Sequence, residues 1–88
     1  MVRRHLLIRG RVQGVSYRES CADLARRSHV TGWIANHADG TVEAELQGGD
    51  AEVDRLVAWC RRGPEGAEVQ EVSVTYLEPV GDSEFAVR

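Results

Sequence analysis

The sequence predicts an α+β fold in which two helices cover one face of an antiparallel sheet. Segments of alternating apolar residues and segments of helical period follow one another in the order strand, helix, strand, strand, helix, strand, and a short strand ends the chain. The 88 residues suffice for one domain, residues 1–88, whose small core needs every element. No internal repeat interrupts this order, which is that of the ferredoxin-like βαββαβ sandwich.

A change of period marks the first strand and the first helix. The strand is expected over Arg4–Arg11, where apolar residues alternate. The helix is expected to begin near Ser16, because Ser16 and Glu19 have the Ser-x-x-Glu spacing of a capping box, and to end near Ser28 or His29. Its apolar residues recur on one helical face: Tyr17, Cys21, Leu24 and Ala25.

The next two strands are expected over Val30–Asn36 and Thr41–Gln47. The Asp39-Gly40 pair between them favours a hairpin. Apolar and polar residues alternate along the second of these strands, so the apolar set is expected to face the core and the polar set to face water. The core set is Val42, Ala44 and Leu46, and the water set is Thr41, Glu43, Glu45 and Gln47.

The second helix has the clearest helical period, formed by Val53, Leu56, Val57 and Cys60. Asp50 is expected to be its N-cap, and Gly63-Pro64 is expected to end it. A long strand over Val69–Leu77 and a short one at Phe85–Val87 complete the sheet, with a turn over 78–82 between them.

Charge and composition exclude several partners. The 11 basic residues, all arginines, are outnumbered by 14 acidic ones, so the net charge of −3 argues against a nucleic-acid partner. Apolar runs such as Leu6-Leu7-Ile8 are far shorter than the roughly 20 residues that span a bilayer. No membrane partner is expected, and no signal peptide is visible, so the predicted location is cytoplasmic.

Cysteine and histidine spacing gives no sign of a metal site. Cys21 and Cys60 lie far apart in sequence, each within a helical pattern, and are expected to be reduced and packed in the core. The three histidines are scattered, and the chain has no Cys-x-x-Cys pair. No metal ligand is therefore assigned.

The segment from Gly10 to Arg18 is the most informative in the chain. It is a glycine-containing loop that leads from a predicted strand to the N-terminus of a predicted helix. The first N–H groups of a helix lack helical partners and can bind an anion. An ordinary strand-to-helix turn would look similar, so the glycines alone leave both interpretations open. Arg18 favours the anion site, because the helix dipole disfavours a cation in the first turn by about 0.3–1 kcal/mol unless an anion is bound. Pairing with Glu19 is the alternative.

Asn36 is the second informative residue, at the end of a predicted strand. If the first strand lies beside this one, Asn36 comes near the loop after the first strand, and its amide can hold a water. The competing interpretation is that asparagine is favoured beside a hairpin turn, where its side chain bonds the local backbone. Taken alone, Asn36 is explained better by the hairpin.

Together the two segments resemble the acylphosphatase family, over nearly the whole chain. The pattern Gly-Arg-Val-Gln-Gly-Val-x-Tyr/Phe-Arg is matched at Gly10–Arg18, and Gly-Trp-x-x-Asn-x-x-x-Gly-x-Val is matched at Gly32–Val42. The shorter matches are Gly48, Gly63-Pro64 and Phe85–Val87. The departures are mild: Ser16 stands where an aromatic residue or glycine is common, and Glu65 where a second proline is common.

The resemblance implies hydrolysis of the carboxyl-phosphate bond of small-molecule acyl phosphates to a carboxylate and inorganic phosphate, without metal or cofactor. By position, Arg18 and Asn36 are the implied catalytic residues: Arg18 binds the phosphoryl oxygens and Asn36 orients the attacking water. The implied phosphoryl-binding backbone amides are those of Gln13, Gly14, Val15, Ser16, Tyr17 and Arg18. Phosphoryl transfer of this kind needs positioning and charge more than acid–base help, so the lack of a general base is compatible with it.

Alternatives on the same fold are less compatible with the residues. An RNA-binding sheet would expose aromatic residues on its central strands, and a metal carrier would have Cys-x-x-Cys in its first loop. An acylphosphatase-like part of a larger maturation enzyme is a closer alternative, but the length of the chain favours a free-standing enzyme. A monomer is expected. His37, in the hairpin, and Arg11, at a strand end, are expected to be bystanders.

Overall fold

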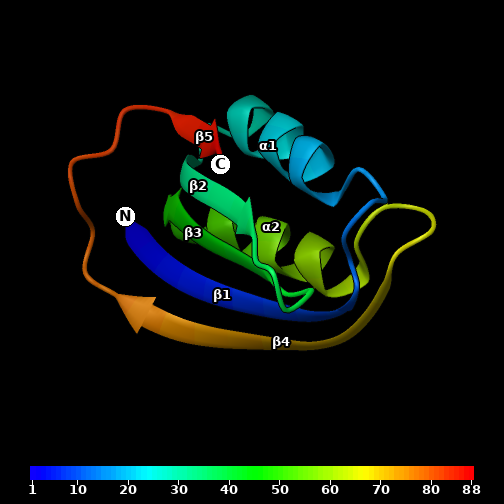
Figure 1. The fold of residues 1–88 in the computed structure, drawn as a ribbon. Coiled ribbons are helices and arrows are strands. Elements are labelled where there is room, and N and C mark those ends of the chain that lie inside the picture. Colours follow the sequence, from blue (N-terminus) through cyan, green and yellow to red (C-terminus); the bar gives the residue numbers. More distant parts are fainter.

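The structure, a computed structural model, describes residues 1–88. Figure 1 shows its seven elements in chain order. They are β1 (Val2–Arg11), α1 (Tyr17–Arg27), β2 (Thr31–Asn36), β3 (Val42–Gly48), α2 (Asp50–Arg62), β4 (Glu68–Leu77) and β5 (Phe85–Val87). The predicted order of strands and helices is confirmed, with β1 beginning two residues earlier than expected, at Val2 instead of Arg4.

The five strands form one sheet in the order β4-β1-β3-β2-β5. β1 pairs antiparallel with both β3 and β4, and β2 pairs antiparallel with β3. β5 departs from the predicted antiparallel sheet, because it pairs parallel with β2. The sheet is therefore mixed: the segment after β4 crosses to the opposite edge and enters β5 in the direction of β2 (Figure 1).

The expectation that the first strand lies beside the second is wrong, because β3 separates them. Leu6 of β1 lies opposite Ala44, which lies opposite Ile34 of β2. β1 and β2 each run antiparallel to β3, so β1 and β2 run in the same direction. Their ends, Arg11 and Asn36, consequently reach the same edge of the sheet, which is where the β1–α1 loop begins.

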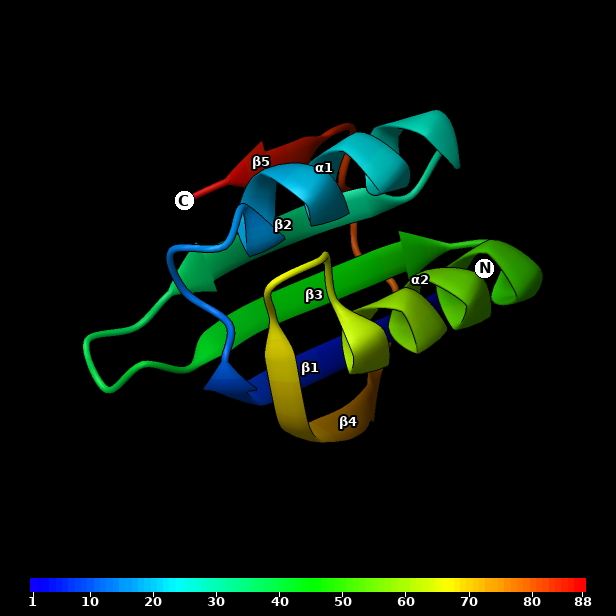
Figure 2. The same ribbon diagram turned by 90° about the vertical axis from the view of Figure 1, so that its right-hand side faces the viewer.

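Both helices lie on one face of the sheet, as Figure 2 shows. α1 packs on β2 and β5, and α2 packs on β1, β3 and β4. Alternate strand residues face the helices and are fully buried: Leu6, Ile8, Ile34, Val42, Ala44 and Leu46. Cys21 and Cys60 are buried and free in this core, which confirms the prediction of unpaired, core-packed thiols. Tyr17 lies between the helices, donating from its hydroxyl to the Cys60 carbonyl at 2.6 Å.

The start of α2 differs from the prediction by one residue. Gly49 is the N-cap and Asp50 is the first helical residue, with no side-chain cap bond. The Val53 N–H donates to the Gly49 carbonyl at 2.9 Å, which closes the first turn without a side chain. Asp50 still stabilises the helix, because a carboxylate in the first turn faces the positive end of the dipole.

Thr41 and Gln47, expected to face water, are instead buried, 7% and 3% exposed. Thr41 precedes β3 and contacts Asp39 and Gln13 in the hairpin turn, whereas the segment after β4 covers the outer face of the sheet at Gln47. Gln47 is paired with Val80 of that segment through two 2.7 Å hydrogen bonds, one in each direction. Arg3, also buried, donates to Gln47 at 3.1 Å and to Glu45 at 2.7 Å. Strand alternation alone reveals neither a covering segment nor the contacts of a turn, so the prediction missed the burial of both residues.

Gly32→Ala is expected to lower the free energy of unfolding by about 3 kcal/mol, since a strained backbone and an overpacked site each cost roughly 1–3 kcal/mol. Gly32 has φ +133°, and a Cβ there would overlap the carbonyl oxygen of Glu45 on β3. Gly81→Ala is the matched control, because a Cβ at Gly81 meets nothing within 4 Å. Urea unfolding of the two variants measures the difference; equal midpoints would contradict the packing described here.

Candidate active site

The β1–α1 loop turns into the helix through two left-handed residues. Gly14 has φ 75° and Ser16 has φ 62°, whereas Val15 between them keeps a negative φ. The predicted capping box is absent: Ser16 is the N-cap of α1, but its side chain makes no cap bond. A capping side chain requires an extended backbone at the N-cap, and the left-handed backbone of Ser16 does not provide it. Alternation of handedness turns successive N–H groups toward one concavity, which suits an anion.

The N–H groups of this loop have no acceptors within the protein. The first backbone bond of α1 runs from the Ser20 N–H to the Ser16 carbonyl at 3.1 Å, and the N–H groups of residues 13–19 donate to no protein atom. A Cβ built on Gly14 would meet nothing within 4 Å, so the loop is open to solvent at this position. The loop thus presents unpaired donors to solvent or to a ligand.

Arg18 reaches from the first turn of α1 toward the end of β5. Its Nη1 donates to the Arg88 carbonyl at 2.7 Å, and the Arg88 N–H donates to the Ile34 carbonyl of β2 at 2.8 Å. The Arg88 guanidinium lies over the Trp33 ring, 4.6 Å from its centroid. The alternative pairing of Arg18 with Glu19 is not formed. The Arg18 guanidinium therefore lies near β2, two residues before its end.

Asn36 is the last residue of β2 and shares the helix-facing side of that strand with Ile34. Its side-chain oxygen Oδ1 is buried and has no hydrogen-bond partner. An unpaired buried acceptor costs about 1–3 kcal/mol, so this oxygen does not stabilise the hairpin turn. The hairpin interpretation of Asn36 is therefore not supported by the contacts of Oδ1.

Asp39 makes the local hairpin bonds instead. Its Oδ1 accepts from the Thr41 hydroxyl at 2.7 Å and from the Thr41 N–H at 3.0 Å, and these bonds lower the pKa of the Asp39 carboxyl. Because Asp39 supplies the turn with its side-chain acceptor, the amide of Asn36 is left available for another partner.

Gln13 joins the loop to the hairpin. Its Nε2 donates to the His37 carbonyl at 2.7 Å and to the Thr41 carbonyl at 3.0 Å. The loop residues and Asn36 thus lie within one connected group, even though they come from strands that are not neighbours. Sequence reasoning assigned only the backbone of Gln13, because the partners of its side chain depend on the sheet order.

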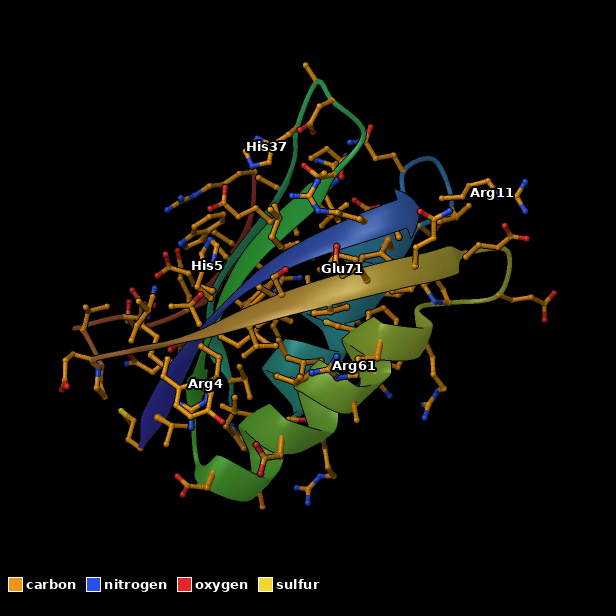
Figure 3. The ribbon with its side chains drawn as sticks, turned by 90° about the horizontal axis from the view of Figure 1, so that it is seen from below. Arg4, His5, Arg11, His37, Arg61 and Glu71 are labelled. Atoms are coloured by element: carbon orange, nitrogen blue, oxygen red, sulfur yellow. The ribbon has the colours of Figure 1, made fainter.

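The side chains of His37 and Arg11, labelled in Figure 3, make their contacts with other residues. His37 Nε2 lies 2.6 Å from one oxygen of Glu43, and His5 Nε2 lies 2.6 Å from the other. Arg11 forms an exposed ion pair with Glu68 at 3.2 Å. Glu43 is on the face of β3 opposite to the buried Val42, so these contacts are consistent with bystander roles.

Glu43→Gln is expected to remove a pH-dependent part of the stability. Hydrogen bonds from His5 and then His37 lower the pKa of Glu43 in the folded protein. The stabilisation is therefore present above the unfolded pKa, about 4.3, and is lost as the pH falls through the folded value. Urea unfolding from pH 3 to 7 should show the variant less stable than wild type at pH 6, and the difference should shrink as the pH falls toward 3. A difference that stays constant with pH would contradict this.

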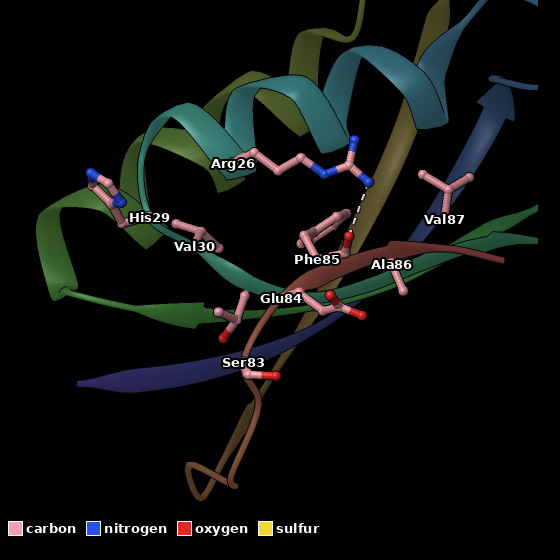
Figure 4. A pocket seen from close by; sticks show the side chains of 9 residues that line it. Arg26, His29, Val30, Ser83, Glu84, Phe85, Ala86 and Val87 are labelled. Atoms are coloured by element: carbon pink, nitrogen blue, oxygen red, sulfur yellow. Dashed lines mark hydrogen bonds between the residues drawn. The ribbon is translucent and has the colours of Figure 1, made fainter.

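The two cavities of the protein lie elsewhere. The larger, about 610 Å³, lies between the end of α1 and β5, where the Arg26 guanidinium donates to the Phe85 carbonyl at 3.0 Å (Figure 4). The smaller, about 270 Å³, lies between the helices beside Trp59. Neither is lined by Arg18 or Asn36, so the candidate site is an open surface.

Two further features concern metals and membranes. No group of three or more His, Cys, Asp and Glu side chains is arranged to hold a metal ion. Neither α1 nor α2 combines the length and the apolar composition of a membrane-spanning helix.

The fold is a βαββαβ sandwich, and its β1–α1 loop places unpaired N–H groups beside an arginine. Such a site suits a small oxyanion such as phosphate. A sequence model of the acylphosphatase family matches residues 4–87, and the chain belongs to that family of hydrolases. An acylphosphatase of Anaeromyxobacter sp. (strain Fw109-5) is 49% identical over 100% of this chain and 96% of its own length.

Solved structures agree with this assignment. The crystal structure of acylphosphatase from Bacillus subtilis has a TM-score of 0.95 and 28% identity, covering 100% of this chain and 99% of that one. The structure of an acylphosphatase from Coxiella burnetii has a TM-score of 0.94 and 33% identity, covering 99% and 92%. The predicted family and the ferredoxin-like architecture are thereby confirmed, with the mixed sheet as the one change.

Proposed function

We propose that this protein binds the phosphoryl group of an acyl phosphate in the β1–α1 loop and cleaves the carboxyl-phosphate bond there with water. The observation that carries the proposal is the run of unpaired N–H groups over residues 13–19, which includes Arg18. A dianionic phosphoryl group fits these donors, because it offers three terminal oxygens as acceptors. Membership of the acylphosphatase family supports the same substrate class.

The phosphoryl oxygens accept from the backbone amides of Gln13 to Arg18 and from the Arg18 guanidinium. Each donor directed at the developing negative charge contributes about 3 kcal/mol to transition-state stabilisation, by analogy with oxyanion holes. Arg18 supplies a fixed positive charge and a planar pair of donors that suits phosphate. In this proposal the substrate displaces the Arg88 carbonyl, which now accepts from Arg18.

The attacking water is held at the side-chain amide of Asn36, whose oxygen has no partner within the protein. The water oxygen forms a bond to phosphorus while the bond from phosphorus to the carboxyl oxygen breaks, and the carboxylate leaves with that electron pair. A proton of the water passes to a phosphate oxygen, so the products are a carboxylate and dihydrogen phosphate. Since the leaving group is a stable carboxylate, neither a metal nor a general base is required in this proposal.

The remaining expectations belong to the same proposal. We infer one acylphosphatase-like domain, residues 1–88, that acts as a monomer in the cytoplasm. The two buried free cysteines support a reducing compartment. Size-exclusion chromatography with light scattering measures the oligomeric state.

The test is hydrolysis of benzoyl phosphate by the purified chain in EDTA, with inorganic phosphate titrated as inhibitor. The proposal predicts turnover without metal and competitive inhibition by phosphate. No turnover, with phosphate still bound, would contradict it and would indicate a phosphate sensor or carrier.

A further inference from the structure

Gln13 has a side chain whose contacts the proposed mechanism does not use. Its amide nitrogen donates to the carbonyls of His37 and Thr41, at 2.7 and 3.0 Å. These two residues are also bonded to each other, because the His37 N–H donates to the Thr41 carbonyl at 2.9 Å. One side chain therefore holds both ends of the hairpin turn that begins directly after Asn36.

No other hydrogen bond joins this loop to that turn. The remaining bonds of the turn are internal, such as that from the Gly40 N–H to the His37 carbonyl at 3.1 Å, or lead to Glu43 on the far face. The loop leaves β1 and the turn leaves β2, and β3 separates these strands. The relative position of loop and turn therefore depends strongly on the amide of Gln13.

We infer that Gln13 is a positioning residue, whose side chain sets the distance between the phosphoryl group held by the loop and the water held by Asn36. This inference rests on the proposed function. In-line attack requires the two reacting atoms to be aligned and close, and a misplacement of about 1 Å can lower the rate about 100-fold. Two hydrogen bonds from one amide restrict such displacement, since the nitrogen must satisfy two acceptors at once.

Gln13→Met tests the inference, because methionine has a similar length but no donor. The backbone amide of residue 13 is retained, so the loop keeps its phosphate donors. We expect kcat for benzoyl phosphate to fall about 10- to 100-fold. The inhibition constant of phosphate should stay within about threefold of wild type, because phosphate binding does not need the water. Gln70→Met, on the exposed side of β4, is the control and should keep wild-type kcat.

A double-mutant cycle separates positioning from a merely structural role. If Gln13 acts through Asn36, then Gln13→Met should cost little further in kcat once Asn36→Ala has removed the side chain that holds the water. The inference is overturned if the kcat of the double variant falls by the full product of the two single losses. It is also overturned if Gln13→Met keeps wild-type kcat while Asn36→Ala is impaired. Either result leaves the proposed function standing. A wild-type chain without hydrolysis, or an Asn36→Ala variant with full activity, would overturn the proposed mechanism itself.

Discussion

Arg18→Ala is expected to nearly abolish the hydrolysis of benzoyl phosphate, lowering kcat/KM about 1000-fold or more, and to weaken inhibition by phosphate. Removing one neutral donor from an oxyanion hole costs about 100- to 1000-fold, and Arg18 supplies two donors and a full charge. The fold should persist, because the only hydrogen bond of this side chain is the exposed one to the Arg88 carbonyl. Steady-state kinetics, phosphate titration and urea unfolding together measure the three effects.

Two variants sharpen this test. Arg18→Lys keeps the charge without the planar pair of donors, and we expect it to recover part of the phosphate affinity but little of the turnover. Arg11→Ala removes an exposed arginine that pairs with Glu68 at the same edge of the sheet, and it should leave kcat/KM within about threefold. An Arg18→Ala variant that retains turnover and phosphate inhibition would show that the loop is not an anion site.

Asn36→Ala is expected to lower kcat about 100-fold or more while phosphate remains a competitive inhibitor of unchanged strength. In the proposed mechanism Asn36 contacts the water and not the phosphoryl group, so its loss acts on turnover alone. The same substitution removes a buried oxygen without a protein partner, so we expect the free energy of unfolding to stay the same or to rise. Kinetics with phosphate titration, together with urea unfolding, measure both.

This combination distinguishes a water-binding asparagine from a structural one. If Asn36 held the hairpin, its truncation would lower the free energy of unfolding of the protein. The truncation would also disturb phosphate binding in the adjacent loop. Asp39→Ala is a suitable comparison, because Asp39 accepts both side-chain bonds from Thr41. Its loss should lower the free energy of unfolding. Equal loss of turnover and phosphate affinity in Asn36→Ala would contradict the role proposed for it.

Much of the fold follows from local patterns. The periods of the apolar residues identify every strand and helix, and the alternation in β3 correctly predicts that Val42, Ala44 and Leu46 face the core. The errors arise where tertiary contacts decide. Gln47 has the polar character of an outward strand residue, yet Arg3 and the segment after β4 bury it.

The candidate site shows the same division. The loop and Arg18 are indicated by glycine spacing and helix-end chemistry, which are local. The left-handed backbone of Ser16 is not indicated by the sequence, because a serine followed three residues later by a glutamate predicts a capping box. The contacts of Gln13 and the unpaired oxygen of Asn36 depend on the order of β1, β3 and β2, which no single segment encodes.

The most direct test of the proposed mechanism is hydrolysis of benzoyl phosphate in ¹⁸O-labelled water, with mass spectrometry of both products. If the loop holds the phosphoryl group and Asn36 directs the water to phosphorus, each phosphate released carries one ¹⁸O atom and the benzoate carries none. Label in the benzoate would mean attack at the carbonyl carbon, and it would contradict the assignment of the phosphoryl group to the loop and of the water to Asn36.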